Sequence, residues 1–229
     1  METWKRTVYI SLICVFCTSF GVSQLAPILP LYFHDLGVQT PSAMSLWSGL
    51  ATGATYLIVC LAAPFWGRVA DKKGRKITLI RSSFGMALCN LLLAFQTTPE
   101  GVVLIRLVQG LVSGFYTATI TLIASETPLE RTGWALGLLA SANLTGSLIG
   151  PLIGGYLADI IGIRNDFILV GILMSIAGVL ATVFIHENYQ PKANVEKLTL
   201  SKLKEKIPEF NSIVALCVAS FIYAICIMS

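Results

Sequence analysis

The sequence predicts an all-helical (all-α) membrane protein, and three observations support that fold class. Hydrophobic residues make up 55% of the 229 residues and charged residues 12%, and the mean hydropathy of +0.77 is far above that of a soluble domain. Apolar runs follow one another along the chain, each at or near the length of about 20 residues that a helix needs to cross a bilayer. The runs are continuous, whereas strands of a membrane barrel alternate between apolar and polar residues, so we expect helices.

Each apolar run is interpreted as one membrane-spanning helix. The first run is longer than the apolar part of a signal peptide, about 7 to 15 residues, so we expect it to stay uncleaved. The predicted domains are a six-span amino-terminal bundle over residues 1–185, a basic cytoplasmic linker over 186–210 and a truncated seventh span over 211–229. The six complete spans are expected near residues 8–33, 44–66, 77–96, 101–124, 134–158 and 167–185.

The distribution of lysine and arginine predicts which ends of the spans face the cytoplasm. Of the 16 cationic residues, all but Arg106 and Arg164 lie before the first span, around the segments that join spans two to three and four to five, or after span six. Cytoplasmic segments are the ones enriched in lysine and arginine. We therefore expect a multi-pass plasma (inner) membrane protein with its amino terminus inside. Topology explains the net charge of +4 without a nucleic-acid partner.

The most highly charged stretch, GRVADKKGRK at residues 67–76, is expected to be the cytoplasmic loop between spans two and three. Cations alone would orient the chain, but this stretch also holds Gly67, Asp71 and Gly74. The same spacing returns 88 residues later in GYLADIIGIR, within the expected outer loop between spans five and six. Two copies at equivalent places, on opposite sides of the membrane, predict an inverted three-plus-three repeat, which is common in secondary transporters.

Four segments resemble motifs of the major facilitator superfamily. GRVADKKGRK is similar to the loop motif of that superfamily, and GVSQLAPILP and LIRLVQGLVSG resemble the first-helix and fourth-helix motifs of its twelve-span drug/proton antiporters. GLLASANLTGSLIGPLIGG resembles the antiporter motif of the fifth helix. The chain thus resembles the amino-terminal half of a bacterial multidrug efflux protein, which implies a six-span bundle of the major facilitator type, followed by the start of a seventh span.

This resemblance implies a role in proton coupling for Arg106, with Gln109 one turn away on the same face. A charged side chain inside a span is costly and is usually retained for a function. Snorkelling of the arginine to the outer interface is the alternative interpretation. Asp35, beside His34 at the outer end of span one, is a further candidate for the proton path, and the alternative is an ordinary interfacial residue.

The resemblance also implies a conformational latch in the second loop and close helix packing in span five. Glycines that recur every fourth residue share one helix face and allow a neighbouring backbone to approach closely. Packing alone would explain the glycines, and orientation alone would explain the cations. The latch residues are Gly67, Asp71, Gly74 and Arg75; the antiporter packing residues are Gly137, Gly146, Gly150, Pro151, Gly154 and Gly155.

Several polar side chains inside the spans are candidates for a substrate cavity, where such groups combine with aromatic walls. The alternative for each is a hydrogen bond between helices. We expect no metal, no cofactor and no enzyme activity, because no metal-ligand cluster, phosphate-binding loop or nucleophile elbow occurs in the sequence. The six cysteines all lie in apolar runs and are interpreted as small apolar side chains. The cavity candidates are Gln24, Tyr56, Asn90, Tyr116 and Asn143.

Three functional hypotheses follow. The first is a proton-coupled exporter of small hydrophobic or amphipathic compounds, which would need a second half-transporter or a homodimer because the substrate site of such proteins lies between the two six-span halves. The second is a truncated remnant or membrane assembly module that does not transport. The third, which the complete glycine pattern of span five opposes, is a facilitator of sugars or metabolites. Membrane lipid and protons are the other expected partners.

Overall fold

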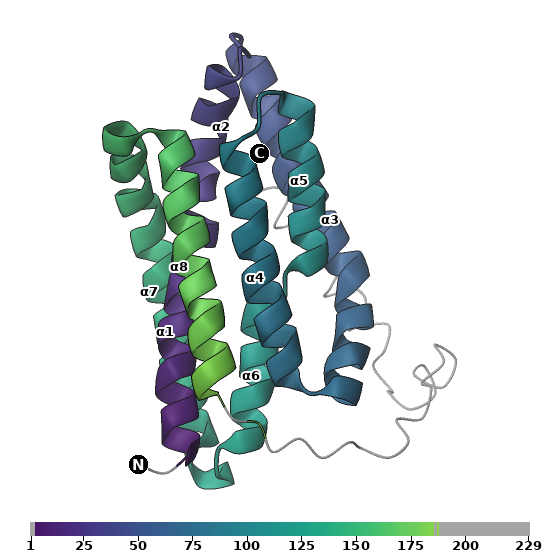
Figure 1. The fold of residues 1–229 in the computed structure, drawn as a ribbon, viewed down its shortest axis with the longest axis vertical. Coiled ribbons are helices and arrows are strands. Elements are labelled where there is room, and N and C mark those ends of the chain that lie inside the picture. The colour runs from purple at the N-terminus through teal and green to yellow at the C-terminus, as the bar shows by residue number, and fades with distance from the viewer. Residues whose placement is uncertain (1–2, 186, 188–229) are drawn as a thin grey trace, which may run out of the picture. The chain divides into compact units, whose positions relative to one another are not determined.

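The computed structural model describes residues 3–185 and Glu187, and all regular secondary structure in this part of the chain is helical (Figure 1). Six segments within it are long and apolar enough to cross a membrane, so the predicted fold class is confirmed. The predicted seventh span, and the predicted linker apart from Glu187, lie outside the described residues. The helices are α1 (Thr3–Ser23), α2 (Leu25–Asp35), α3 (Pro41–Lys73), α4 (Arg75–Ala94), α5 (Pro99–Val112), α6 (Phe115–Glu126), α7 (Leu129–Ile161) and α8 (Ile163–Phe184).

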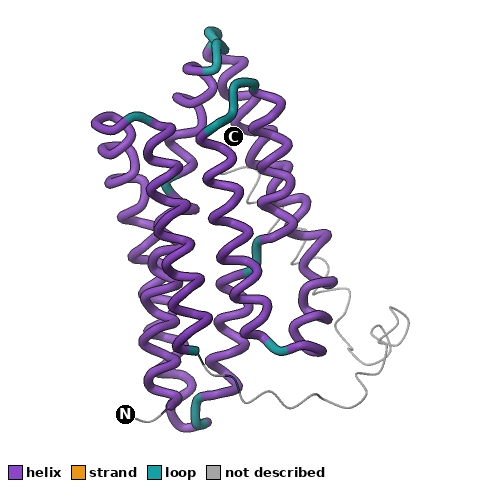
Figure 2. Tube along the Cα trace, viewed as in Figure 1, coloured by secondary structure: helices purple, strands orange, loops and turns teal. Residues whose placement is uncertain are grey.

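The first and fourth spans each consist of two helices, which hydrophobicity alone does not reveal. Span one is interrupted at Gln24, between α1 and α2. Pro27, in the first turn of α2, has no amide hydrogen and its ring clashes with the carbonyl four residues earlier, so a continuous helix is disfavoured there. Span four is interrupted between α5 and α6, a short loop in Figure 2, where Ser113 is extended and Gly114 has a φ of +111°. Glycine adopts this left-handed conformation without the steric cost of a Cβ.

The predicted loop at residues 67–76 is mostly helix, which corrects the expectation. Nothing in GRVADKK breaks a helix, so α3 continues to Lys73, and its last turn carries two lysines that complement the helix dipole. The turn itself is made by Gly74, which has a φ of +94° and donates its amide to the carbonyl of Ala70 at 3.0 Å. The charged stretch therefore extends α3 beyond its apolar segment and starts α4 after a single residue.

The second copy of the repeat has the same local geometry. Gly162 has a φ of +85°, its amide donates to the carbonyl of Ala158 at 3.0 Å, and it joins α7 to α8 as Gly74 joins α3 to α4. The predicted outer loop between spans five and six is thus the end of α7, Gly162 and the first turn of α8. Asp159 and Asp166, both expected in that loop, are helical residues.

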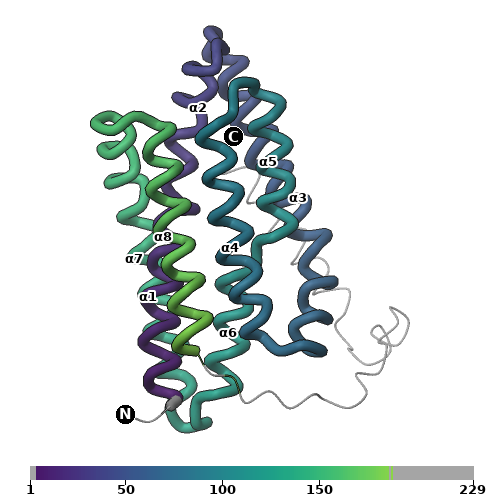
Figure 3. The backbone as a smooth tube through the Cα atoms, in the orientation of Figure 1, coloured from purple at the N-terminus to yellow at the C-terminus, as the bar shows by residue number. Residues whose placement is uncertain are grey.

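The helix packing follows the symmetry of an inverted repeat. Span one (α1) packs mainly against span five (α7), span two (α3) against span four (α5), and span three (α4) against span six (α8). An inverted repeat relates spans one, two and three to spans four, five and six. Under this exchange, the contact between spans one and five becomes the contact between spans four and two. The contact between spans three and six is converted into itself. Figure 3 shows α4 beside α8 and α1 beside α7 and α8. The broken spans, one and four, are also equivalent under this exchange.

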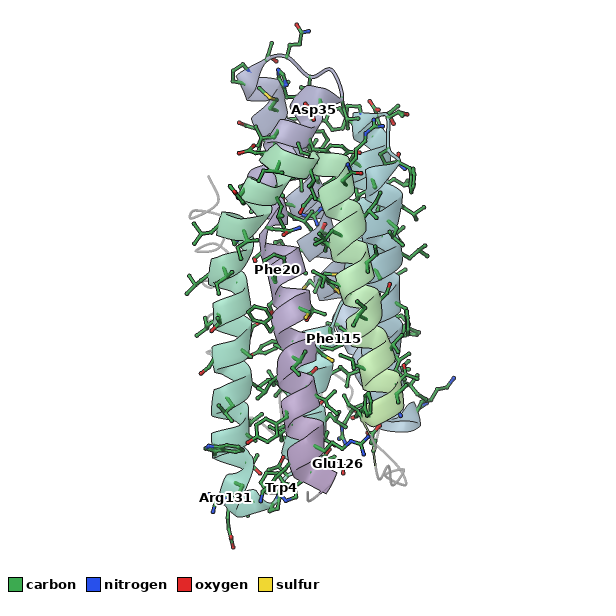
Figure 4. The ribbon with its side chains drawn as sticks, turned by 60° about the vertical axis from the view of Figure 1, so that its left-hand side comes forward. Trp4, Phe20, Asp35, Phe115, Glu126 and Arg131 are labelled. Carbon is green, nitrogen blue, oxygen red and sulfur yellow. The ribbon has the colours of Figure 1, made fainter. Side chains whose placement is uncertain are left out.

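Three clusters of buried apolar side chains fill the bundle, a small one between α4 and α8 and two larger ones. One of the larger clusters gathers side chains from α1, α4, α6, α7 and α8, and the other gathers α2 and the facing parts of α3, α4, α5, α7 and α8. Figure 4 shows Trp4, Glu126 and Arg131 at one end of the bundle and Asp35 at the other. These are called the Trp4 end and the Asp35 end below. Few of the apolar side chains of α3 and α7 are fully buried by other described residues.

Glu187 ties the end of span six to the start of α4. Its two carboxylate oxygens accept hydrogen bonds from the backbone amides of Arg75 and Lys76, both at 2.8 Å. The first amides of a helix have no partner inside the helix, and a carboxylate there both satisfies them and complements the positive end of the helix dipole. Glu187 therefore caps α4 at the turn that carries the predicted latch.

Replacing Glu187 with glutamine should loosen the first turn of α4, because the amide keeps one acceptor oxygen and loses the charge. A lost cap of this kind costs about 1 kcal/mol, so the Arg75 and Lys76 amides should exchange their hydrogens roughly fivefold faster. Hydrogen–deuterium exchange of the chain in lipid nanodiscs measures this. The matched control is Glu130→Gln, an exposed glutamate in the first turn of α7. Unchanged exchange at both amides would contradict the capping role.

Candidate functional site

Arg106 and Gln109 form a buried polar pair on α5. The guanidinium Nη1 of Arg106 donates to Oε1 of Gln109 at 2.7 Å, and the two side chains are only 7% and 3% exposed. The predicted shared face is therefore observed, and the side chain does not snorkel away from the bundle. Arg106 forms no ion pair within the described part of the chain, and its Nε has no acceptor there. A buried cation held by one neutral partner is an unusual and costly arrangement.

Span two approaches this pair closely. The hydroxyl of Thr55 on α3 donates to the backbone carbonyl of Arg106 at 3.1 Å. One residue after Gln109, a Cβ added at Gly110 would lie 2.5 Å from the carbonyl oxygen of Thr55, so only glycine permits this contact. The motif LIRLVQG thus combines a charge, its hydrogen-bond partner and the glycine that lets α3 pack beside them.

The predicted glycine face of span five packs against α1. A Cβ added at Gly146 would lie 2.7 Å from the carbonyl oxygen of Phe16, and one at Gly150 would lie 2.6 Å from that of Phe20. Gly154 continues the face, where a Cβ would lie 2.5 Å from the Cβ of Gln24. The close approach of two backbones is what a small-residue stripe at this spacing makes possible.

The other members of the antiporter packing set lie differently. A Cβ at Gly137 or Gly155 would meet no atom within 4 Å, so these glycines are not needed for packing among the described residues. Pro151 lies inside α7, which continues through it. The six residues therefore divide into the three glycines that contact α1 and Gln24, and three positions for which the described part of the chain shows no such contact.

Gln24 and Asp166 form a second buried polar pair, which the sequence analysis missed. The Nε2 of Gln24, at the break in span one, donates to Oδ2 of Asp166 on α8 at 2.9 Å, and both side chains are 0% exposed. Gln24 was expected in a substrate cavity and Asp166 in a loop. An acid immediately before the apolar run of span six could have placed Asp166 in a helix first turn, but no sequence signal indicates Gln24 as its partner.

The remaining cavity candidates do not converge within the described part of the chain. Asn143 accepts a hydrogen bond from the hydroxyl of Ser19 at 2.6 Å, and Asn90 donates to the carbonyl of Met86 at 2.9 Å. Tyr116 packs against the apolar cluster near the Trp4 end, and Tyr56 is 55% exposed on α3. Asn143 bridges α7 to α1, and Asn90 bonds its own helix. Their contact with a substrate stays a prediction.

The predicted latch residues line a cavity of about 400 Å³ that is bounded by α3, α4, α5 and α6. Gly67, Asp71 and Arg75 contribute to its wall, and Gly74 makes the turn beside it. Trp66 and Gly114 line it too, so the cavity reaches the break in span four. The motif residues are thus brought together at the place where spans two, three and four meet, and the latch itself stays a prediction.

Arg81 secures the break in span four. Its guanidinium donates to the carbonyls of Leu111 at 3.3 Å and Ser113 at 3.0 Å, and it stacks on the Trp66 ring with 3.4 Å from Cζ to the ring centroid. The Nε1 of Trp66 donates to the same Leu111 carbonyl at 2.7 Å. Backbone carbonyls freed by a helix break within a membrane need such donors. Arg81 was counted among the loop cations, but it lies within α4 and acts inside the bundle.

Asp35 lies at the end of α2, where its carboxylate is 3.9 Å from Nδ1 of His34. The two side chains are 62% and 63% exposed, so the structure places them at the end of the bundle and not in its interior (Figure 4). Within the described residues, no group of three or more histidine, cysteine, aspartate or glutamate side chains is arranged to hold a metal ion.

The sequence matches known proteins along nearly its whole length. A family model of the Major Facilitator Superfamily matches residues 11–229. Relatives named "Multidrug resistance protein MdtG" are 38% identical over 209 residues in Proteus mirabilis and 42% identical over 195 residues in Enterobacter lignolyticus. These matches cover 90% and 85% of this chain but 52% and 47% of the relatives. The chain therefore spans about half the length of the curated relatives it matches.

Solved structures share the fold at low sequence identity. The human organic anion transporter MFSD10 (TETRAN) matches with a TM-score of 0.74 and 16% identity over 90% of this chain and 53% of its own. The POT family transporter PepTSo matches with a TM-score of 0.67 and 17% identity over 82% of this chain and 39% of its own. The repeat geometry, the motif residues and the family match agree, and we conclude that this multi-pass membrane protein belongs to the Major Facilitator Superfamily.

Proposed function

We propose that the chain forms the amino-terminal half of a proton-coupled exporter of small hydrophobic or amphipathic compounds. The observation that carries this proposal is Arg106, a buried cation inside a span whose only described side-chain partner is the neutral Gln109. Burying such a charge is energetically costly, and a structural role alone does not offset that cost. A buried charge of this kind is instead used at a site that handles protons or charged groups. The two MdtG relatives named above support multidrug compounds as the substrate class.

In the transport cycle, the two three-span repeats of this chain would move relative to the corresponding repeats of a second half-transporter. Substrate sites in these folds lie at the interface between repeats, near the middle of the membrane. The described bundle leaves much of α3 and α7 uncovered, including Gly137 and Gly155 of the antiporter set. The second half would cover these faces, supplied either by further spans or by a second copy of this chain.

The orientation follows from the charges at the two ends of the bundle. The Trp4 end carries the cations at the start of α1, around Gly74 and at the start of α7, and the Asp35 end has Arg164. The positive-inside rule therefore directs the Trp4 end to the cytoplasm of a bacterial plasma membrane. In this orientation the Asp71 and Arg75 latch faces the cytoplasm, and the Gln24–Asp166 pair lies in the outer half.

The test is the export of a fluorescent cationic dye from energised cells that express this chain, with and without a protonophore. We expect dye efflux above that of cells carrying an empty vector, and complete loss of the difference when the protonophore collapses the gradient. Co-expression with the second half of a full-length MdtG relative tests whether the half is completed by another chain. A well-inserted chain that exports no dye in either setting would favour the remnant or assembly module.

A further inference from the structure

The Gln24–Asp166 pair contains two buried oxygens that lack a hydrogen-bond donor. Oε1 of Gln24 and Oδ1 of Asp166 have no partner among the described residues, although the other atoms of the two head groups bond each other at 2.9 Å. Buried polar atoms are nearly always paired, so two orphan acceptors in one pair call for an explanation. A single proton on the Asp166 carboxyl supplies the donor that both oxygens lack.

Among the described residues, no cation compensates a negative charge on Asp166. Within the described part of the chain it forms no ion pair, and its one hydrogen-bond donor is a neutral amide. The dipole at the start of α8 favours an anion there, but this effect is small beside the cost of burying an unpaired carboxylate.

Apart from the buried Cys89 thiol, the titratable groups on the elements packed around Asp166 are engaged elsewhere or exposed. The Tyr32 hydroxyl on α2 donates to the carbonyl of Leu93 at 2.6 Å, and the Arg164 guanidinium on α8 donates to the carbonyl of Gln96 at 3.3 Å. The last turn of α1 has no titratable side chain. The others toward this end are His34 and Asp35 on α2 and Tyr156 and Asp159 on α7, all exposed, and the Cys89 thiol on α4.

The inverted repeat provides a second argument. Span three supplies Arg81 to the break in span four, and span six supplies Asp166 to the break in span one. The spans that make these two contacts exchange under the repeat symmetry, although Arg81 and Asp166 are not equivalent positions. Arginine carries a permanent charge, so the span-four break is held at any physiological pH. Asp166 can gain or lose a proton, which makes the span-one break the one whose stability can depend on protonation.

We propose that Asp166 is a proton-binding site of the transport cycle, holding its proton while the span-one break is packed against α7 and α8. On losing the proton, the carboxylate needs water or further donors, and the pair must separate to reach them. The Gln24 side chain packs directly against Gly154, since a Cβ added at Gly154 would lie 2.6 Å from Oε1 of Gln24. Separation therefore moves α1 and α2 relative to the glycine face of α7. This role rests on the proposed function, because it assigns one carrier of the coupled proton.

Infrared spectroscopy of the purified chain in lipid nanodiscs tests the protonation directly. A protonated carboxyl absorbs at a frequency separate from that of a carboxylate, and exposed acids are ionised at about pH 7. We expect a protonated-carboxyl band at this pH in the parent chain and in Asp159→Asn, an exposed acid near the same end, but not in Asp166→Asn. Absence of the band from the parent, or its persistence in Asp166→Asn, would overturn the proposal.

Gln24→Met keeps the test decisive if Asp166→Asn does not insert. Methionine fills a similar volume without the amide, so the hydrogen bond to Asp166 is lost and the carboxyl band should shift in frequency. A band that stays at the same frequency would show that another group produces it, and the proposal would fail.

Transport measurements distinguish this proposal from the proposed function. In a preparation that exports dye, Asp166→Asn should lose the stimulation by a proton gradient and keep the passive exchange of dye across the membrane. Gradient-driven export at the parent rate in Asp166→Asn would overturn the role of Asp166 and leave the exporter intact. If the parent exports no dye, the proposed function fails, and the infrared band alone decides whether Asp166 binds a proton in the packed bundle.

Discussion

Replacing Gly150 with leucine is expected to separate α1 from α7 and to destabilise the bundle. A Cβ at this position would lie 2.6 Å from the carbonyl oxygen of Phe20 and would also collide with the hydroxyl of Ser23. Backbone cannot move aside as the end of a flexible side chain can, so the helices must move apart. Overpacking of this kind typically costs about 1 to 3 kcal/mol, and we expect a value near the upper end.

The measurement is the thermal unfolding of the purified chain in detergent, followed by circular dichroism. The matched control is Gly155→Leu on the same helix, where an added Cβ meets no atom within 4 Å. Leucine has the higher helix propensity, by about 1 kcal/mol, so the control should be neutral or slightly stabilising. Equal unfolding midpoints for the two variants would show that the glycine stripe does not determine how closely α1 and α7 pack.

Replacing Arg106 with alanine is expected to abolish gradient-driven export without harming insertion. A central arginine costs about 2.5 to 3.5 kcal/mol on membrane insertion scales, so its removal favours the inserted chain. The lost hydrogen bond to Gln109 leaves only a neutral amide, which is less costly than a buried charge. If the variant inserts at least as well as the parent but does not transport, the loss of transport is due to the missing arginine and not to poor insertion.

Dye efflux from energised cells measures this effect, with the amount of inserted chain determined in the same cells. Arg164→Ala is the matched control, because it removes an exposed arginine near the same end of the bundle and should export at the parent rate. Arg106→Lys keeps the charge but loses the planar donor group, so an intermediate rate is expected. If Arg106→Ala exports dye as the parent does, the buried charge has no part in coupling.

Much of the fold was predictable because the bilayer restricts the possible structures. Continuous apolar runs must be helices in lipid, and the bias of cations orients them. The glycine pairs Gly67 and Gly74, and Gly155 and Gly162, revealed the repeat by spacing alone, and the turn geometry at Gly74 and Gly162 agrees with it. The one-turn spacing of Arg106 and Gln109 likewise predicted their contact, because residues three apart share a helix face.

What the sequence by itself determined is therefore local or imposed by the membrane: the six spans, the three-plus-three repeat, the family motifs and the pairs that lie one turn apart. The tertiary structure decided which distant groups meet. Arg81 reaches the break in span four, Glu187 caps α4, and Asp166 reaches Gln24 across 142 residues of sequence. Such contacts depend on how the helices pack and where they break, and hydropathy carries no information about partners so far apart. The physical reason is that burial selects polar partners by proximity in space, which only the packed bundle defines.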